Sequence, residues 1–337
     1  MKAWVEKGAH LGKAARRKTR DLTEEKIHSI LVIRHAALGD MIQTRPFLVE
    51  LKKLFPQSSI TLSLISNYQY AAPLDLVDHV HVIEGSDKRE ISILKRFQNF
   101  KSLPAYDLLF DLACTSRSKM LTFFTAAKLK LSFPYKKNLF LYDVCLHRSD
   151  FRFEAENLLE FLFYFGHQPS YPIDYQMPQN NNYKNSKDIY CFFGASNPNR
   201  CYPIEEWFML LKKLSQQFAD HTFYILNGTQ ESENYEKKIH ALEIHNIKPL
   251  PSQSLSELSK KLLKAKLFIS NDTGLRHLAI AHRTPTVGFF TNTCPGRNLP
   301  TYEDTHLLIL EKNSEKKFPI VEIVIDKISS WISKIEF

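Results

Sequence analysis

Residues 267–285 place a short apolar run, a polar turn and an apolar-spaced helix in succession, and a second apolar run follows at 286–290. The first run, 267–269, has the composition of a buried parallel strand. It ends in Ser270-Asn271-Asp272-Thr273-Gly274, residue types that cap helices and form turns. A strand, a helix and another strand in this order are the unit of a parallel sheet, so the stretch predicts an α/β fold.

The turn at 270–274 has two interpretations. The first N–H groups of a helix and the positive end of its dipole attract anions, and ligands of open parallel sheets bind at the carboxyl ends of strands. The alternative is an ordinary capped helix in an α/β core. His277 lies one turn into the helix, where it can reach the same anion or pack in the core.

The strand and helix pattern occurs in both halves of the chain. A strand at 30–33, a turn at 34–40, a helix at 41–55 and a strand at 60–65 form one such unit. After residue 187 the pattern restarts, with strands at 189–193 and 222–226 and helices from Pro203 and at 255–263. Residues 167–187, which precede this second pattern, are rich in Pro and Asn, and this composition predicts a linker. The 337 residues suit two domains, and we expect a ligand between their carboxyl-end loops.

The charge is basic and unevenly distributed. The net charge is +9, with a surplus of seven bases in residues 1–165 and of two in residues 166–337. The first half is therefore the expected partner of an acidic molecule. Seven bases lie in residues 1–20, which can rest on anionic lipid headgroups or form a solvated arm. The chain shows no nucleic-acid-binding motif, so we expect no nucleic acid partner.

The sequence carries no marker of secretion or of membrane insertion. Its apolar runs are shorter than the roughly 18 residues that span a bilayer, and its basic start lacks the apolar centre of a signal peptide. The expected location is therefore the cytoplasm. The five cysteines have no CxxC spacing, which predicts neither disulfides nor a zinc site.

Two loops carry candidate chemistry. Asp40 follows Gly39 at a strand-to-helix turn, where a carboxylate can act as a general base or simply cap the helix. Ser196 and Arg200 supply a hydroxyl and a cation suited to a diphosphate, although Arg200 alone can also be a surface residue. The glycine patterns of dinucleotide and P-loop sites are absent. No Asp-x-Asp pair occurs, so a metal on the diphosphate is not indicated.

Three motifs resemble glycosyltransferase family 9, the bacterial ADP-heptose:lipopolysaccharide heptosyltransferases. The first comprises residues 30–34, Leu38-Gly39-Asp40 and residues 44–46. The second joins residues 193–196 to Arg200-Cys201-Tyr202-Pro203, where the family usually has Trp at the position of Tyr202. The third runs from 272 to 278 and continues at 284–287. The resemblance covers nearly the whole chain from Ile30 onward, and it departs from the family at Ala36-Ala37, where Ser residues are usual.

The resemblance implies a GT-B fold, two Rossmann-like domains facing across a cleft. The expected parts are a basic arm (1–28), an acceptor-binding domain (29–166), a linker (167–187), a nucleotide-sugar-binding domain (188–319) and a final helix (320–337) that packs back on the first domain. By motif position Asp40 would be the base of an inverting transfer. The implied donor contacts are Ser196, Arg200, Gln230, Glu231, Asp272, Thr273, Gly274, Leu275 and His277, and the implied acceptor contacts are Arg34, Gly39 and Arg45.

The implied reaction needs neither a cofactor nor a metal. The donor would be ADP-heptose and the acceptor lipid A–Kdo or inner-core lipopolysaccharide, at the inner face of the cytoplasmic membrane. Two alternatives remain open. One is another GT-B enzyme, such as a hexosyltransferase or a UDP-sugar epimerase, and the other is a non-catalytic envelope-binding protein.

Overall fold

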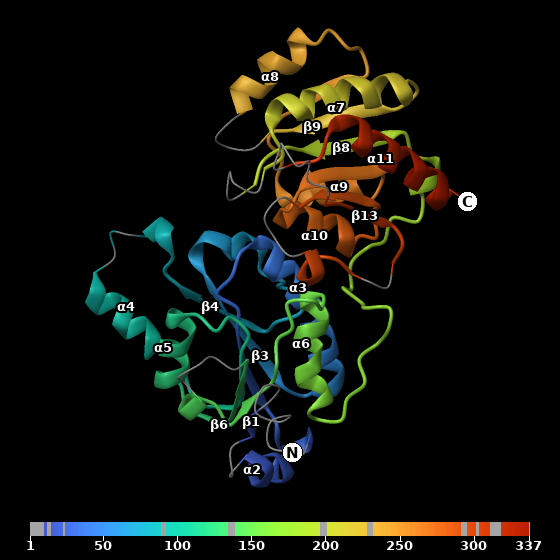
Figure 1. The fold of residues 1–337 in the computed structure, drawn as a ribbon. Helices are drawn as coiled ribbons and strands as arrows, with labels where there is room; N and C mark the ends of the chain where they lie inside the picture. The colour runs from blue at the N-terminus through green and yellow to red at the C-terminus, as the bar shows by residue number, and fades with distance from the viewer. Residues whose placement is uncertain are drawn as a thin grey trace. The chain divides into compact units, whose positions relative to one another are not determined.

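The computed structural model divides the chain into two compact units, Met1–Gln176 and Met177–Phe337 (Figure 1). The division falls inside the segment expected to be a linker. The structure describes residues 10–11, 15–22, 24–88, 90, 92–133, 139–195, 201–227, 232–290, 295–300, 303–310 and 318–336.

The first unit is built on a seven-stranded sheet in the order β1-β7-β6-β5-β2-β3-β4. All neighbouring strands are parallel except β1 and β7, which pair antiparallel. The strands are β1 (His10–Leu11), β2 (Ser29–Ile33), β3 (Ser59–Ile65), β4 (His79–Ile83), β5 (Tyr106–Asp111), β6 (Ala127–Ser132) and β7 (Val144–Cys145). The helices are α2 (Ala15–Asp21), α3 (Leu38–Leu54), α4 (Ile93–Phe100), α5 (Ser116–Phe124) and α6 (Glu154–Phe163).

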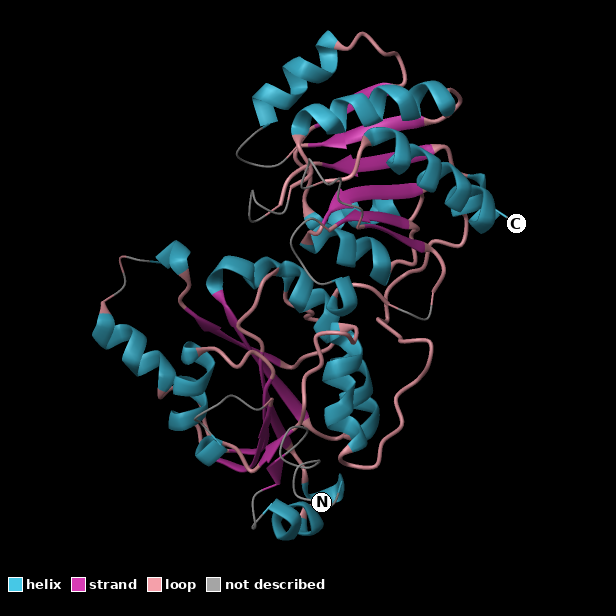
Figure 2. Ribbon diagram, viewed as in Figure 1, coloured by secondary structure: helices cyan, strands magenta, loops and turns pink. Residues whose placement is uncertain are grey.

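Helices cover both faces of this sheet (Figure 2). Side chains alternate along a strand, and neighbouring residues of β5 therefore enter different cores. Leu109 packs with Leu121 of α5, whereas the Phe110 ring packs edge-on against Phe47 of α3 and Phe161 of α6. Strands that are buried on both faces consist mainly of consecutive apolar residues, and β2 and β3 could therefore be predicted from the sequence.

The second unit has a six-stranded, fully parallel sheet in the order β10-β9-β8-β11-β12-β13. Its strands are β8 (Asp188–Phe192), β9 (Thr222–Leu226), β10 (Ile247–Leu250), β11 (Leu267–Asn271), β12 (Thr286–Phe289) and β13 (His306–Ile309). Its helices are α7 (Ile204–Gln217), α8 (Ser232–Ala241), α9 (Leu255–Leu262), α10 (Gly274–Ala281) and α11 (Val321–Glu336).

The final helix, α11, packs within the second unit. Its buried side chains Val324, Ile328 and Trp331 belong to the same apolar cluster as Trp207 of α7, and the Trp331 ring nitrogen donates to the Asp304 carbonyl at 3.0 Å. The buried face of α11 is thus part of the second unit's core, and packing of this helix on the first domain stays a prediction. Apolar spacing correctly predicts an amphipathic helix, but it does not specify which apolar surface covers it.

The described part of the basic arm packs on the first unit. Ala15 of α2 is fully buried, the Lys18 ammonium pairs with the Asp143 carboxylate at 2.6 Å, and the hydroxyls of Thr19 and Tyr164 lie 2.6 Å apart. Residues 1–9, 12–14 and 23 lie outside the described part. The solvated-arm interpretation thus does not hold for α2.

Candidate functional site

Asp40 lies in the first turn of α3, directly after β2. The cap position is taken by Ala37, so the interpretation of Asp40 as the capping residue is wrong. A carboxylate in the first turn is stabilised by the helix dipole and by N–H groups that lack helical partners. The Asp40 side chain is 37% exposed, which leaves carboxylate surface available to a substrate.

A buried cation holds Asp40 from its other side. The Arg34 side chain is 1% exposed, and its Nη2 lies 3.0 Å from Asp40 Oδ1 and 2.9 Å from Glu154 Oε1. Its Nη1 donates to the Leu112 carbonyl at 2.6 Å, and Arg148 forms a second ion pair with Glu154. Burial works against the charged form of Arg34, yet the charges of Asp40 and Glu154 outweigh it and raise the pKa of Arg34. The guanidinium therefore stays charged.

The Arg34 guanidinium is enclosed by protein groups and contacts Asp40 from the buried side. Contact of Arg34 with the acceptor stays a prediction. Gly39 is also buried. Arg45 forms a bidentate pair with Asp75, at 2.9 and 2.6 Å, and donates to the Tyr175 carbonyl at 3.0 Å.

The second candidate site is the turn between β11 and α10. Asn271 ends β11 and accepts a hydrogen bond from the Tyr202 N–H at 2.9 Å, while its amide donates to the Phe193 carbonyl. Thr273 occupies the cap position in extended backbone but makes no side-chain capping bond. Its Oγ1 is buried and has no hydrogen-bond partner among the residues that the structure describes. The turn thus combines a buried hydroxyl with the first N–H groups of α10, those of Gly274 and Leu275, and hydroxyl and N–H donors are the kind of groups that bind an anion.

Asp272 and His277 flank this turn and are buried, at 9% and 5% exposure. The Asn298 amide lies 3.5 Å from Asp272 Oδ2. Four further residues predicted to contact the donor, Ser196, Arg200, Gln230 and Glu231, lie outside the described residues. The structure therefore brings together Asp272, Thr273, Gly274, Leu275 and His277 at one strand end.

Arg276 is a residue of this turn that the sequence reasoning missed. It is fully buried, and its Nη2 donates to the Asn298 carbonyl. Its Nε and Nη1 have no hydrogen-bond partner within the described part of the chain. Its guanidinium lies 4.9 Å from the centre of the Phe290 ring. Burial lowers the pKa of Arg276 to about 10, against the opposing effect of Asp272. One signal for Arg276 was present in the sequence, a charged residue on a helix that was predicted to pack on a sheet.

Gly288 makes room for this arginine, and we expect Gly288→Ala to destabilise the second unit by about 1–3 kcal/mol through overpacking. An added Cβ would lie 2.9 Å from the Phe290 ring and 3.1 Å from Arg276 Cδ. Urea denaturation checks the loss. Because Arg276→Ala removes one of these contacts, the losses of the two variants should not add. Full additivity would contradict the steric explanation.

Glu154 was also missed, although the sequence carries a signal for it. It lies on the buried side of α6 with Leu158 and Phe161, so it is a charge on an apolar helix face. Such a charge needs a buried partner. The partner, Arg34, is distant in sequence and could not be identified without the fold.

Among the residues that the structure describes, no group of three or more His, Cys, Asp or Glu side chains is arranged to hold a metal ion. Within the same residues, no helix combines the length and the apolar character needed to cross a bilayer.

Known proteins similar to this chain give a consistent result. The family described as "Glycosyltransferase family 9 (heptosyltransferase)" matches residues 96–324. Lipopolysaccharide heptosyltransferase 1 of Campylobacter coli is 26% identical over 297 residues, which cover 80% of this chain and 85% of that protein. A putative glycosyltransferase of Haemophilus influenzae is 25% identical over 293 residues, which cover 79% and 83%.

Solved structures show the same fold. E. coli heptosyltransferase WaaC with ADP matches with a TM-score of 0.72 at 19% identity, over 90% of this chain and 99% of that one. The glycosyl transferase family 9 structure from Veillonella parvula matches with a TM-score of 0.71 at 17% identity, over 91% and 98%. The two sheets, parallel apart from the β1–β7 pair, are those of the GT-B fold, as expected. The matched family model spans more than half of the sequence, and the chain therefore belongs to glycosyltransferase family 9, the heptosyltransferases, and is a glycosyltransferase.

Proposed function

We propose that this enzyme transfers a heptose from ADP-heptose to the Kdo/heptose inner core of lipopolysaccharide, with inversion at the anomeric carbon. The observation that carries the proposal is the exposed Asp40 carboxylate held by a buried arginine. A general base needs a free face toward the acceptor hydroxyl and a fixed orientation behind it. In the proposed step, Asp40 takes the hydroxyl proton as the acceptor oxygen bonds to the anomeric carbon and the bond to the diphosphate breaks.

The leaving ADP carries the developing negative charge, and the turn after β11 is the proposed place for it. Thr273 Oγ1 and the first N–H groups of α10 are donors that can be fixed before the reaction, which is how electrostatic stabilisation works best. Ser196 and Arg200 remain predicted contacts of the diphosphate, and Gln230 or Glu231 of the ribose or adenine. A related enzyme, E. coli WaaC, has been solved with ADP and with ADP-2-deoxy-2-fluoro heptose.

We further propose that the transfer is independent of metals and takes place at the inner face of the cytoplasmic membrane, where a lipid A–Kdo or inner-core acceptor is accessible. The charge surplus of seven bases in residues 1–165 supports an acidic acceptor on the first unit. Turnover of ADP-heptose on a panel of truncated lipopolysaccharide acceptors, with and without EDTA, tests donor, acceptor and metal together. Activity lost in EDTA and restored by a divalent ion would overturn metal independence.

ADP-sugar should stabilise the folded protein where UDP-sugar does not. A ligand that binds only the native state at about a hundredfold excess over Kd adds about 2.7 kcal/mol, which for a chain of this size raises Tm by several degrees. Thermal unfolding with ADP-heptose, ADP-glucose and UDP-N-acetylglucosamine separates the candidates. A shift with the UDP-sugar alone would favour an epimerase, and an equal shift with both ADP-sugars would favour a hexosyltransferase.

A further inference from the structure

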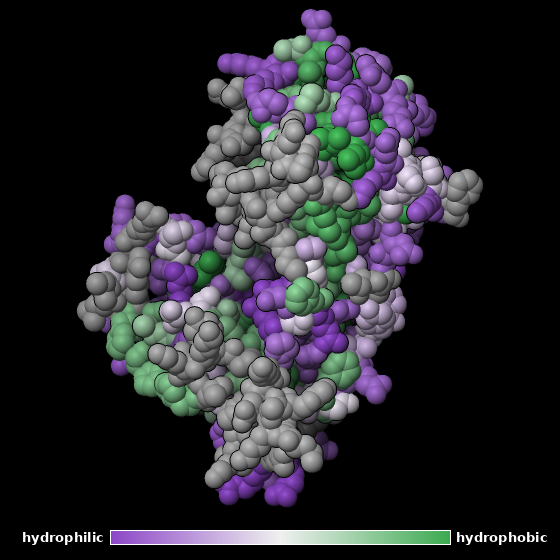
Figure 3. Space-filling view, viewed as in Figure 1, coloured by the Kyte–Doolittle hydropathy of each residue, from purple (hydrophilic) through white to green (hydrophobic). Residues whose placement is uncertain are grey.

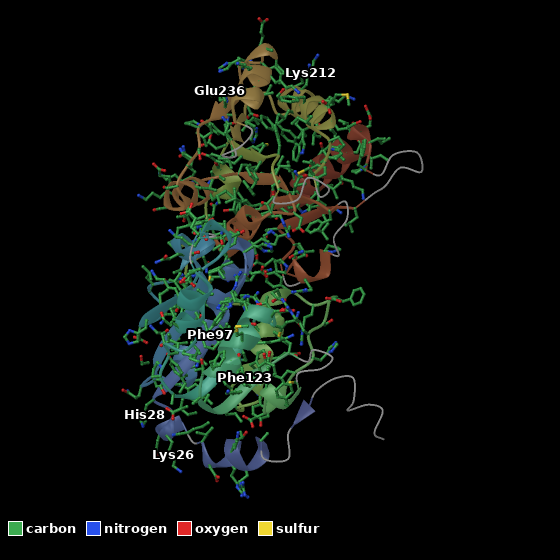
Figure 4. All side chains as sticks on the ribbon, turned by 90° about the vertical axis from the view of Figure 1, so that its left-hand side faces the viewer. Lys26, His28, Phe97, Phe123, Lys212 and Glu236 are labelled. Atoms are coloured by element: carbon green, nitrogen blue, oxygen red, sulfur yellow. The ribbon has the colours of Figure 1, made fainter. Side chains whose placement is uncertain are left out.

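Two helices of the first unit, α4 and α5, present large apolar side chains to solvent. Phe97 on α4 is 40% exposed, and Met120 and Phe123 on α5 are 45% and 62% exposed. Phe124 joins the two helices, because its ring centre lies 5.1 Å from that of Phe97 and 5.2 Å from that of Phe123. We call Phe97, Met120, Phe123 and Phe124 the aromatic patch. Figure 3 shows apolar side chains gathered over these helices, and Figure 4 labels Phe97 and Phe123 on the same side of the unit.

The core of the unit does not account for this patch. α5 already buries Leu121 against the sheet, in a cluster with Leu31 and Leu109, and Phe100 of α4 packs on the same cluster. The helix α5 is thus apolar on its inner side and again on its outer side. Single exposed apolar residues are ordinary, whereas a contiguous exposed group points to an interaction surface.

Positive charge lies beside the aromatic patch and elsewhere on its two helices. Lys101 Nζ lies 4.6 Å from the centre of the Phe97 ring and 5.3 Å from that of Phe124. Neither α4 nor α5 contains an Asp or a Glu, and Lys95, Arg117 and Lys119 add bases to them. Residues 91–106 and 112–142 also contain no acidic residue.

The combination of exposed aromatics with bases, on two helices that contain no acidic residue, fits an anionic lipid surface. Apolar side chains enter the boundary between headgroups and acyl chains, while Lys and Arg meet the phosphates. Interfaces between proteins are depleted in Lys, so a protein partner fits this surface less well. The patch also belongs to the unit that carries Asp40. The strand before α5, β5, pairs with β2, and Asp111 is the partner of Ile33.

We propose that α4 and α5 form a membrane-contact surface, on which the aromatic patch inserts into an anionic bilayer and Lys95 and Lys101 bind lipid phosphates. This inference rests on the proposed function in one respect, because a lipid-anchored acceptor gives the enzyme a reason to bind a bilayer. It assigns the contact to the two helices rather than to the basic arm, of which Lys18 is already paired with Asp143.

Flotation of the full-length protein with vesicles of phosphatidylethanolamine and about one quarter phosphatidylglycerol tests the surface. We expect Phe97→Ser with Phe123→Ser to lower vesicle partition on the order of tenfold or more, since each aromatic loses its burial in the bilayer. We expect Lys95→Glu with Lys101→Glu to lower vesicle partition by at least about tenfold. The difference from the wild type should become smaller at high salt, because salt screens the attraction between these bases and the lipid phosphates. Vesicles of phosphatidylcholine alone should bind the wild type weakly.

Matched variants remove aromatics and charges elsewhere. Phe151 is 85% exposed and precedes α6, which covers the other face of the sheet, so Phe151→Ser should bind vesicles as the wild type does. Lys212→Glu with Lys237→Glu makes the same charge change on α7 and α8 and should have little effect. All variants should keep wild-type turnover on a soluble, lipid-free acceptor, which also shows that they are folded.

Three results would overturn the proposal. The first is unchanged vesicle binding by the aromatic double variant. The second is loss of vesicle binding by Arg17→Glu with Arg20→Glu, but not by the α4 and α5 variants, which would assign the contact to the basic arm. The third is a wild type that does not bind vesicles but sediments as a dimer, together with an aromatic double variant that sediments as a monomer in the same sedimentation-velocity experiment. If vesicle binding depends on the aromatic patch but the wild type shows no turnover on any lipopolysaccharide acceptor, the membrane-contact surface is supported and the proposed function is rejected.

Discussion

Asp40→Asn is expected to lower kcat by on the order of 10²-fold or more, because the variant has no group that can accept the acceptor proton. The amide has nearly the same shape, and its oxygen can still accept from Arg34, which lies 3.0 Å from Asp40 Oδ1 in the wild type. Arg34 also keeps its pair with Glu154. The fold should therefore survive, and the loss should fall on the chemical step. Single-turnover transfer from ADP-heptose to a soluble acceptor measures it.

A matched change elsewhere in the same unit isolates the chemistry. Asp143 is likewise an ion-paired carboxylate, 2.6 Å from Lys18, and Asp143→Asn should leave kcat close to that of the wild type. The ADP affinity of Asp40→Asn, measured by calorimetry, should also be unchanged, because the proposed donor site is on the second unit. A rate within about tenfold of the wild type would remove Asp40 from the role of base.

Arg34→Met is expected to destabilise the first unit by about 3–5 kcal/mol, which is the usual cost of removing one partner from a buried ion pair. The change deletes the cation that contacts Asp40, Glu154 and the Leu112 carbonyl. Glu154, 1% exposed, would keep only the pair with Arg148 among these contacts. Because the chain divides into two compact units, hydrogen exchange should rise in peptides of the first unit and stay unchanged in the second.

Lys213→Met is the control for this experiment. Lys213 pairs with Glu322 at 2.5 Å, but both side chains are well exposed, at 46% and 64%. Such pairs contribute roughly 0–1 kcal/mol, so the control should unfold at nearly the same urea concentration as the wild type. An equally small loss for Arg34→Met would show that burial does not set the strength of the Arg34 interactions.

Much of the fold could be predicted from the sequence because its buried parallel strands are apolar runs. The runs at 30–33, 60–65 and 267–269 are strands β2, β3 and β11. Strand β6 was not predicted, since Lys128 and Lys130 interrupt its apolar residues. β13 was missed too, because its four residues begin with a histidine, His306, and lie outside any longer apolar pattern.

The candidate site was predictable to the extent that its residues are neighbours in sequence. Asp40 follows its strand within a few residues, and the residues 272–277 are consecutive, running from the end of β11 into the first turn of α10. Glu154 and Leu112 reach Arg34 across 120 and 78 positions, and a single sequence gives no measure of such contacts. The buried contacts of Arg34 could not be predicted for this reason, since its neighbours in space were unknown.

The contacts of Arg34 tie the orientation of the carboxylate to the assembly of the whole first unit. The Arg34 guanidinium donates to Asp40 in the first turn of α3, to the carbonyl of Leu112 after β5, and to Glu154, the first residue of α6. If α6 loosens, Arg34 loses a counter-charge before any strand separates, and the proposed base, Asp40, loses its fixed orientation. We therefore expect catalysis to fail on heating several degrees before the cooperative melting of the sheet, so that inactivation reports on α6 rather than on global unfolding.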